Sequence, residues 1–179
     1  ISVLTEERRF RGSLADLDAV RARVDIPVLR KDFIVGPYQI HEARAHGADV
    51  ILLIVAALDD EQMRSLYELA HELGMAVLVE AHTSEEIARA AKLGAKILGV
   101  NTRNLKDLSV DPARFAPLAA EATGHTHLVA ESGVATSAEV ELYAAAGADL
   151  VLVGEALVKP GDPQPAVAEF TRAGRAQRP

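Results

Sequence analysis

The chain lacks cysteine and tryptophan and has few aromatic residues, and each absence excludes a class of protein. Without cysteine, its 179 residues cannot form a disulfide scaffold, a thiolate metal site or a cysteine nucleophile, and a reducing cytoplasm is the expected compartment. An aromatic fraction of 4% argues against stacking platforms for bases, and a net charge of −7 disfavours binding to nucleic acid or anionic membranes. No apolar run reaches the roughly 18 residues that span a bilayer. The classes of protein that remain are enzymes and small-molecule binders.

Short β-branched runs alternate with helical segments along the whole chain. We expect strands at Ile1–Thr5, Pro27–Lys31, Val50–Val55, Ala76–Glu80, Ile97–Asn101, Leu128–Glu131 and Leu150–Val153. Helix starts are expected at Ser13, Asp60, Ser84, Asp111-Pro112 and Ser137, and helix ends at Gly47, Gly74, Gly94 and Gly147. This alternation predicts βαβ units and a parallel sheet, covered by helices because the strands are apolar nearly throughout.

An internal repeat favours a closed barrel over an open sheet. A glycine, an alanine and a charged residue precede three of the strands, at Gly47–Asp49, Gly94–Lys96 and Gly147–Asp149. Lys31, Glu80 and Glu131 each end an apolar run on alternate strands, as expected of a (β/α)8 TIM barrel, where catalytic groups gather at the carboxyl ends of the strands. An open doubly wound sheet is expected to carry a glycine-rich dinucleotide fingerprint, and neither G-x-G-x-x-G nor a P-loop occurs.

Several residues at these strand ends suit acid–base chemistry and anion binding. Lys31 and Glu80 form a plausible acid–base couple, although a surface lysine or a salt bridge closing the barrel end would explain each one alone. Asn101 and Arg103 suit recognition of hydroxyl or anionic groups, or simple turn chemistry. Glycines follow the last two expected strands, where barrels often bind phosphate, at Gly133 and Gly154. The six histidines show no metal-ligand spacing, so no metal is expected.

Together these segments resemble the indole-3-glycerol phosphate synthase family. The resemblance runs from Ile1 to about Phe170 and rests on Ile1–Glu6, Phe10–Ser13, Val28–Val35, Leu78–Ala81, Asn101–Leu105, Glu131–Val134 and Val153–Val158. It implies a TIM-barrel carboxy-lyase of tryptophan biosynthesis. The enzyme closes the indole ring of 1-(2-carboxyphenylamino)-1-deoxyribulose 5-phosphate with loss of CO₂ and water, and needs no cofactor.

The resemblance also implies a role for each matching residue. Lys31 would be the general acid that polarises the substrate carbonyl, and Glu80 would serve proton transfers during dehydration. Residues that orient the substrate hydroxyls would be Asn101, Arg103, Glu131 and Ser132. The phosphate cradle would be formed by Gly133, Gly154 and the backbone N–H of Glu155. The apolar wall around the aromatic ring would be formed by Phe10, Phe33, Leu52 and Leu105.

The chain departs from the family at its front, because the family's first strand, with its own lysine and glutamate, has no counterpart in residues 1–179. We expect one domain, residues 1–179, holding strands 2–8 of the barrel, with residues 171–179 as a frayed tail. We also expect a monomer that is weakly active or inactive as this chain alone. The alternatives are another phosphate-binding TIM-barrel enzyme, such as a sugar-phosphate isomerase or lyase, and an inactive truncated phosphate-binding module.

Overall fold

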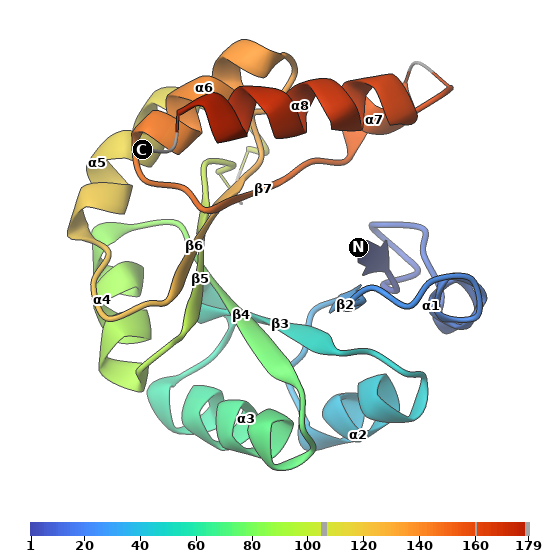
Figure 1. Ribbon diagram of the computed structural model, residues 1–179. Coiled ribbons are helices and arrows are strands. Elements are labelled where there is room, and N and C mark those ends of the chain that lie inside the picture. The colour runs from blue at the N-terminus through green and yellow to red at the C-terminus, as the bar shows by residue number, and fades with distance from the viewer. Residues whose placement is uncertain (105–106, 160, 178–179) are drawn as a thin grey trace.

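The computed structural model describes residues 1–104, 107–159 and 161–177 and shows one curled parallel sheet with helices on its outer side (Figure 1). The strands, in sheet order, are β1 Ser2–Leu4, β2 Leu29–Lys31, β3 Val50–Ile54, β4 Ala76–Ala81, β5 Ile97–Asn101, β6 His127–Glu131 and β7 Leu150–Leu152. The helices are α1 Leu14–Arg21, α2 Pro37–Ala45, α3 Asp60–Glu72, α4 Ser84–Leu93, α5 Phe115–Glu121, α6 Ser137–Ala145, α7 Glu155–Val158 and α8 Gln164–Ala176, with 3₁₀ turns η1 Val55–Ala57 and η2 Pro112–Arg114. The predicted barrel topology is confirmed for these seven successive strands.

Local sequence signals set the helix boundaries. Ser13 caps α1 by accepting the backbone N–H of Asp16, and Asp59 forms a full capping box with Gln62 at the start of α3. Gly94 ends α4 in the left-handed conformation, at φ 86°, where glycine carries no Cβ penalty. α8 continues to Ala176, and Ala173 is buried, so this helix includes residues 171–176 that the sequence assigned to a frayed tail.

The repeated glycine-alanine-charge motif has a structural role in two of its three copies. Asp49 Oδ2 accepts the backbone N–H of Val28 at 2.8 Å, and Asp149 Oδ2 accepts that of Leu128 at 2.9 Å. Each aspartate therefore ties the start of its own strand to the preceding strand. In the middle copy the charged residue is Lys96, whose ammonium group cannot accept a hydrogen bond. Its backbone carbonyl oxygen accepts the N–H groups of Thr126 and His127 instead.

Alternation along the strands gives the sheet two different faces. The outer face packs against the helices in one large apolar cluster that includes Ile51, Leu53 and Val79. The inner face carries a smaller cluster of Leu29, Leu52, Ile54, Leu78 and Val129. Because side chains alternate along a strand, residues two positions beyond these inner ones also point inward. The polar groups at the ends of β2, β4 and β6 thus project into the barrel.

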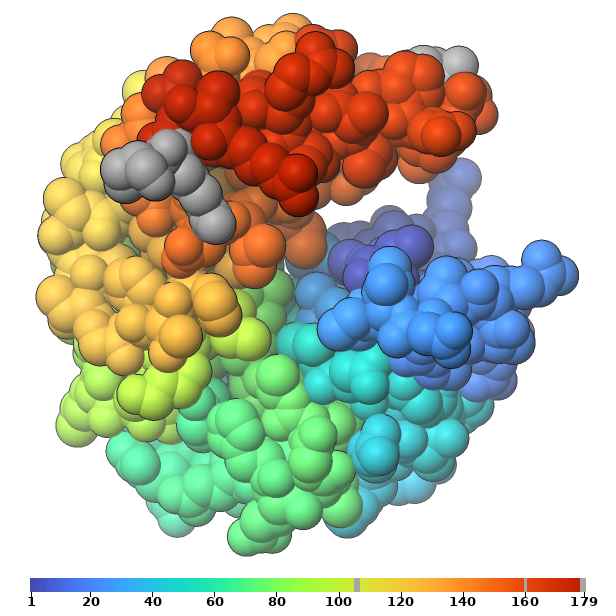
Figure 2. All heavy atoms as spheres, viewed as in Figure 1, coloured from blue at the N-terminus to red at the C-terminus, as the bar shows by residue number. Residues whose placement is uncertain are grey.

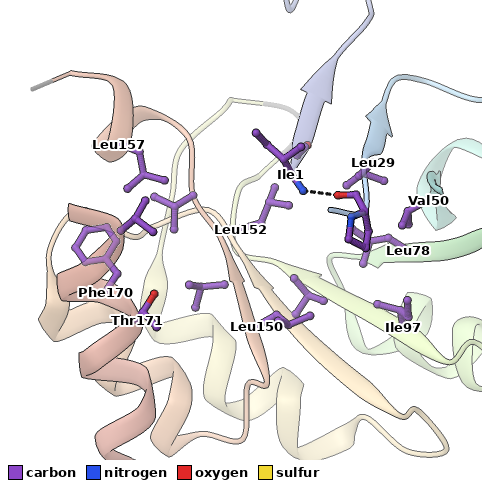
Figure 3. Close-up of a pocket in the computed structure, with 16 residues that line it drawn as sticks. Ile1, Leu29, Val50, Leu78, Ile97, Leu150, Leu152, Leu157, Phe170 and Thr171 are labelled. Atoms are coloured by element: carbon purple, nitrogen blue, oxygen red, sulfur yellow. Dashed lines mark hydrogen bonds between the residues drawn. The ribbon is translucent and has the colours of Figure 1, made fainter. Parts of the chain in front are cut away.

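The sheet is open between its two edge strands, β1 and β7. Figure 2 shows the opening between the N-terminal segment and α8. A cavity of about 520 Å³ lies along this seam, and its lining includes Leu29 and Leu78 on one side and Leu150 and Phe170 on the other (Figure 3). The lining side chains are almost all apolar, so the cavity is a hydrophobic seam.

Candidate active site

The strand register brings three ionisable side chains together inside the barrel. Lys31 ends β2, Glu80 lies near the end of β4 and Glu131 ends β6, each two residues beyond an inward-facing leucine or valine. Lys31 Nζ lies 3.5 Å from Glu80 Oε2, and the Glu80 side chain is 2% exposed. The predicted convergence of charged groups from alternate strands is therefore confirmed, with Lys31 and Glu80 as an ion pair.

The two glutamates of this cluster hold opposite protonation states. Burial opposes ionisation of Glu80, but contact with His82 and the charge of Lys31 outweigh it and lower the pKa of Glu80 to about 2. Burial, together with the negative charge of Glu80, raises the pKa of Glu131 well above its ordinary value. Between these two pKa values the site pairs an ionised carboxylate with a neutral carboxylic acid.

Gly99 makes room for the neutral carboxylic acid. A Cβ at this position of β5 would lie 2.0 Å from Glu131 Oε1 and 3.2 Å from a methyl group of Leu78. Among the described residues, the oxygens of Glu131 and Oε2 of Glu80 have no hydrogen-bond partner outside this pair of carboxyl groups. Buried polar atoms without partners are unfavourable unless a ligand or water satisfies them, so this cluster is suited to bind a polar group.

His82 also belongs to the site, although no histidine was predicted to have a role there. Its Nε2 lies 3.2 Å from Glu80 Oε1, and its Nδ1 lies 3.2 Å from Glu86 Oε2 of α4. Burial disfavours the charged ring, but the two glutamates reverse this effect and raise the pKa of His82 to about 9. The available sequence signal was Glu80-Ala81-His82 followed by Glu86 one helical turn later.

The loops after β5 and β6 meet through Asn101 and Ser132. Asn101 Oδ1 accepts both the backbone N–H of Arg103 at 3.0 Å and the Ser132 hydroxyl at 2.9 Å. Ser132 is held in the left-handed region at φ 67°, a strained conformation for serine that is common at functional sites. Tyr143 of α6 supports it by donating its hydroxyl to the Ser132 carbonyl at 3.0 Å. The Arg103 guanidinium bonds the carbonyl of Leu108 at 2.9 Å.

Two of the residues predicted for the apolar wall stack beside the lysine. The rings of Phe10 and Phe33 lie 5.2 Å apart with an angle of 22° between their planes, and Lys31 Nζ lies 5.9 Å from the centre of the Phe10 ring. Leu52 is 1% exposed and belongs to the inner cluster against which Phe33 packs. Leu105 lies outside the described residues.

The residues predicted for phosphate binding lie in two neighbouring loops. Gly133 has φ 79°, and a Cβ there would lie 2.6 Å from the Tyr143 hydroxyl, so this position requires glycine. Gly154 precedes α7 with open space around it and a negative φ. The Glu155 side chain is 72% exposed and pairs with Lys159 at 2.7 Å, so only its backbone suits an anion.

The hydrophobic seam offers no second centre of chemistry. The seam cavity has no Asp, Glu, His, Lys or Arg side chain in its lining. Within residues 1–104, 107–159 and 161–177, no group of three His, Asp or Glu side chains is arranged to hold a metal ion, and no helix is long and apolar enough to cross a membrane. The charged cluster at the ends of β2, β4 and β6 is therefore the candidate active site.

Comparisons with known proteins identify relatives of this chain. A family model described as Indole-3-glycerol phosphate synthase matches residues 1–170. Curated relatives named indole-3-glycerol phosphate synthase include one from Micrococcus luteus, 64% identical over 173 residues, and one from Rhodococcus jostii, 62% identical over 174 residues. Each alignment covers 97% of this chain, and the chain spans 65% of the length of either relative.

Solved structures of lower identity share the fold. The crystal structure of 3-hexulose-6-phosphate synthase from Salmonella typhimurium has a TM-score of 0.78 at 18% identity, covering 99% of this chain and 87% of that chain. The structure of 3-keto-L-gulonate-6-phosphate decarboxylase from Vibrio cholerae has a TM-score of 0.75 at 16% identity, covering 99% and 86%. At these identities the likeness concerns the fold alone.

Proposed function

Because this chain belongs to the indole-3-glycerol phosphate synthase family, we propose that its protein closes the indole ring of 1-(2-carboxyphenylamino)-1-deoxyribulose 5-phosphate. A ring carbon attacks the ketone carbon, and the carboxylate then leaves as CO₂. The resulting hydroxyl leaves as water to give indole-3-glycerol phosphate. The observation that carries this proposal is the ion pair of half-buried Lys31 and buried Glu80, beside Glu131, whose ionisation is disfavoured.

Each member of the cluster has a chemical task in this proposal. The Lys31 ammonium donates a proton to the carbonyl oxygen as the new carbon–carbon bond forms. Glu80 is ionised, so it is suited to accept a proton from the neighbouring carbon during dehydration. The buried oxygens of Glu131 and the linked side chains of Asn101 and Ser132 would orient the substrate hydroxyls, with Arg103 beside them.

The remaining predicted residues would hold the two ends of the substrate. The stacked Phe10 and Phe33 rings, above Leu52, suit the aromatic ring. The backbone near Gly133, Gly154 and Glu155 suits the phosphate, because backbone N–H groups bind anions and the glycines allow close approach. Leu105, which lies outside the described residues, remains part of the proposed apolar wall.

The proposal also includes the compartment, the oligomeric state and the substrate class of the protein. The protein would act as a cytoplasmic monomer on a small phosphorylated substrate with an aromatic carboxylate, without a cofactor. We expect a polypeptide limited to residues 1–179 to turn over weakly or not at all, because β1 and β7 each pair with only one strand and an open seam runs between them.

The direct test is turnover by the protein at the full length of its relatives. Purified protein is incubated with substrate labelled with ¹³C in its carboxylate, and released CO₂ and indole-3-glycerol phosphate are both quantified. We expect the two products in equal amounts. Absence of both at saturating substrate, from folded protein, would contradict the proposal.

A further inference from the structure

His82 connects the reacting pair to helix α4 through a line of alternating charges. Glu86 Oε2 lies 3.2 Å from His82 Nδ1, His82 Nε2 lies 3.2 Å from Glu80 Oε1, and Glu80 Oε2 lies 3.5 Å from Lys31 Nζ. The imidazole ring therefore sits between two carboxylates, and its far nitrogen contacts the one that faces the proposed reaction.

Four further hydrogen bonds hold the His82 backbone and anchor the helix that supports the ring. Glu86 Oε2 also accepts the His82 backbone N–H at 2.7 Å, so one carboxylate holds both the backbone and the ring. Arg114 of η2 donates to the His82 carbonyl at 2.8 Å. α4 is itself anchored, because Arg89 donates to the carbonyl of Val55 at 3.0 Å and to Asp60 at 2.7 Å. The ring is thus clamped from a rigid helix.

Stability alone is a poor explanation for such an arrangement. Buried ion pairs lose much of their attraction to the cost of removing charge from water, and apolar residues of similar size are often as stabilising. His82 is 5% exposed and Glu80 is 1% exposed, so both bear that cost. Clamped groups of this kind are typical of active sites, where a third residue orients an acid or base.

We propose that His82 is a positioning residue that, clamped by Glu86, holds the Glu80 carboxylate in place and keeps it ionised for proton transfer. This inference rests on the proposed function of Glu80. His82 does not need to touch the substrate, since its effect passes through Glu80.

The charged groups around the His82 ring determine how removal of the ring changes the pKa of Glu80. They are Glu80 of β4, Glu86 and Arg89 of α4, Arg114 of η2, Lys31 of β2 and the neutral Glu131 of β6. Without the His82 cation, the Glu80 carboxylate stays buried but loses one of the contacts that favour its ionised form. The pKa of Glu80 then rises, and a higher pH is needed to ionise it.

Two substitutions at His82 in the full-length protein distinguish the effect of its contact with Glu80 from the effect of its positive charge. H82N keeps a polar group near Nδ1 and loses the contact to Glu80, and we expect kcat to fall by about a hundredfold, the cost of displacing a catalytic group by about 1 Å. KM stays within about twofold, and the acidic limb of the kcat profile moves up by about one to three pH units. H82Q places an amide N–H near Nε2, so it recovers part of kcat while its acidic limb stays shifted.

H46N is the matched control, because His46 Nδ1 pairs with Asp18 at 2.6 Å on α1, away from the cluster. We expect it to leave kcat and its pH profile unchanged. Folded H82N with wild-type kcat and an unmoved acidic limb would overturn the inference. The inference would also be overturned if the decreases in kcat of H82N and H82Q only paralleled their thermal stability and the pH profile of kcat did not move.

A measurement independent of turnover distinguishes this inference from the proposed function. The ring nitrogens of His82, followed by NMR, should lose their proton near pH 9 in the wild type and at lower pH in E86Q. A ring that titrates near its ordinary value of 6.5 in the wild type would overturn the inference, even in protein that turns the substrate over.

Discussion

At the scale of single residues, one cation and two carboxyl groups share the interior of the barrel, and these neighbours shift the pKa values of both carboxyl groups. Lys31 contacts Glu80, and His82 adds a second positive group to the same carboxylate. Burial and the charge of Glu80 act against ionisation of Glu131 and outweigh the charge of Lys31. The cluster therefore offers a base and a neutral acid at the same pH.

The neutral Glu131 predicts a specific pH dependence of stability. Its folded pKa is raised above the ordinary 4.5, so its contribution is fully present below pH 4.5 and is lost as pH rises toward the folded pKa. Between pH 5 and 6, the free energy of unfolding measured in urea should fall more steeply for the wild type than for E131Q, by up to about 1.4 kcal/mol. The exposed Glu141 supplies the control, since E141Q should keep the wild-type slope. Equal slopes for E131Q and the wild type would show that Glu131 is ionised in the folded protein.

Gly99 provides a second residue-scale prediction. A methyl group there would overlap the Glu131 carboxyl, which is the movable end of a side chain, so G99A should displace that group at little cost in stability. We expect kcat to fall at least tenfold, within the range lost when catalytic groups are misplaced by up to about 1 Å. G174A, in α8, meets only Val140 at 3.5 Å and should keep full activity with a melting temperature that is unchanged or higher. Full activity in G99A would mean that the carboxyl position does not matter.

At the scale of elements, the aspartates of the repeated motif fix how neighbouring strands meet. D49A removes the acceptor for the buried Val28 N–H and the partner of Arg21, and it should lower the free energy of unfolding by about 1–3 kcal/mol. K96A, at the equivalent position of the middle copy, removes a side chain that accepts no backbone N–H. It should change the free energy of unfolding by less than about 0.5 kcal/mol. Chemical denaturation of both variants checks this. Equal losses in both would mean that the motif stabilises through something other than the carboxylate.

The elements also show what sequence could and could not predict. Strand and helix positions followed from apolar runs, caps and glycines, and the meeting of Lys31, Glu80 and Glu131 followed from their places at the ends of alternate strands. Arg30 could not be predicted as buried, because its burial depends on Asp32 and on Glu42 of α2, each 2.9 Å away. His82 was missed for a similar reason, since its partners lie on both a strand and a helix.

At the scale of the whole molecule, the open seam is the feature that sets this chain apart from a closed barrel. β7 faces the seam with Leu150 52% exposed, whereas inward leucines of the central strands are buried. Exposed apolar surface along a sheet edge is typical of sites that take up further polypeptide. The curated relatives are longer than this chain, which covers 65% of their length.

The seam predicts dye binding by a polypeptide limited to residues 1–179. We expect it to enhance the fluorescence of anilinonaphthalene sulfonate, because the dye binds exposed apolar surface. L150E should reduce the signal, and Y38E should not, since Tyr38 is 74% exposed on α2 and is not part of the cavity lining. An equal reduction in both variants would place the dye elsewhere.

The most direct test of the account is the kcat of K31M against K92M in the full-length protein. Lys92 is an exposed lysine of α4 that pairs loosely with Asp60 at 3.8 Å, so its loss controls for a change in net charge. We expect K31M to lower kcat for indole-3-glycerol phosphate formation by about a hundredfold or more, the usual contribution of a general acid, and K92M to keep wild-type activity. A folded K31M variant with wild-type kcat would contradict the central claim that Lys31 donates the proton for ring closure.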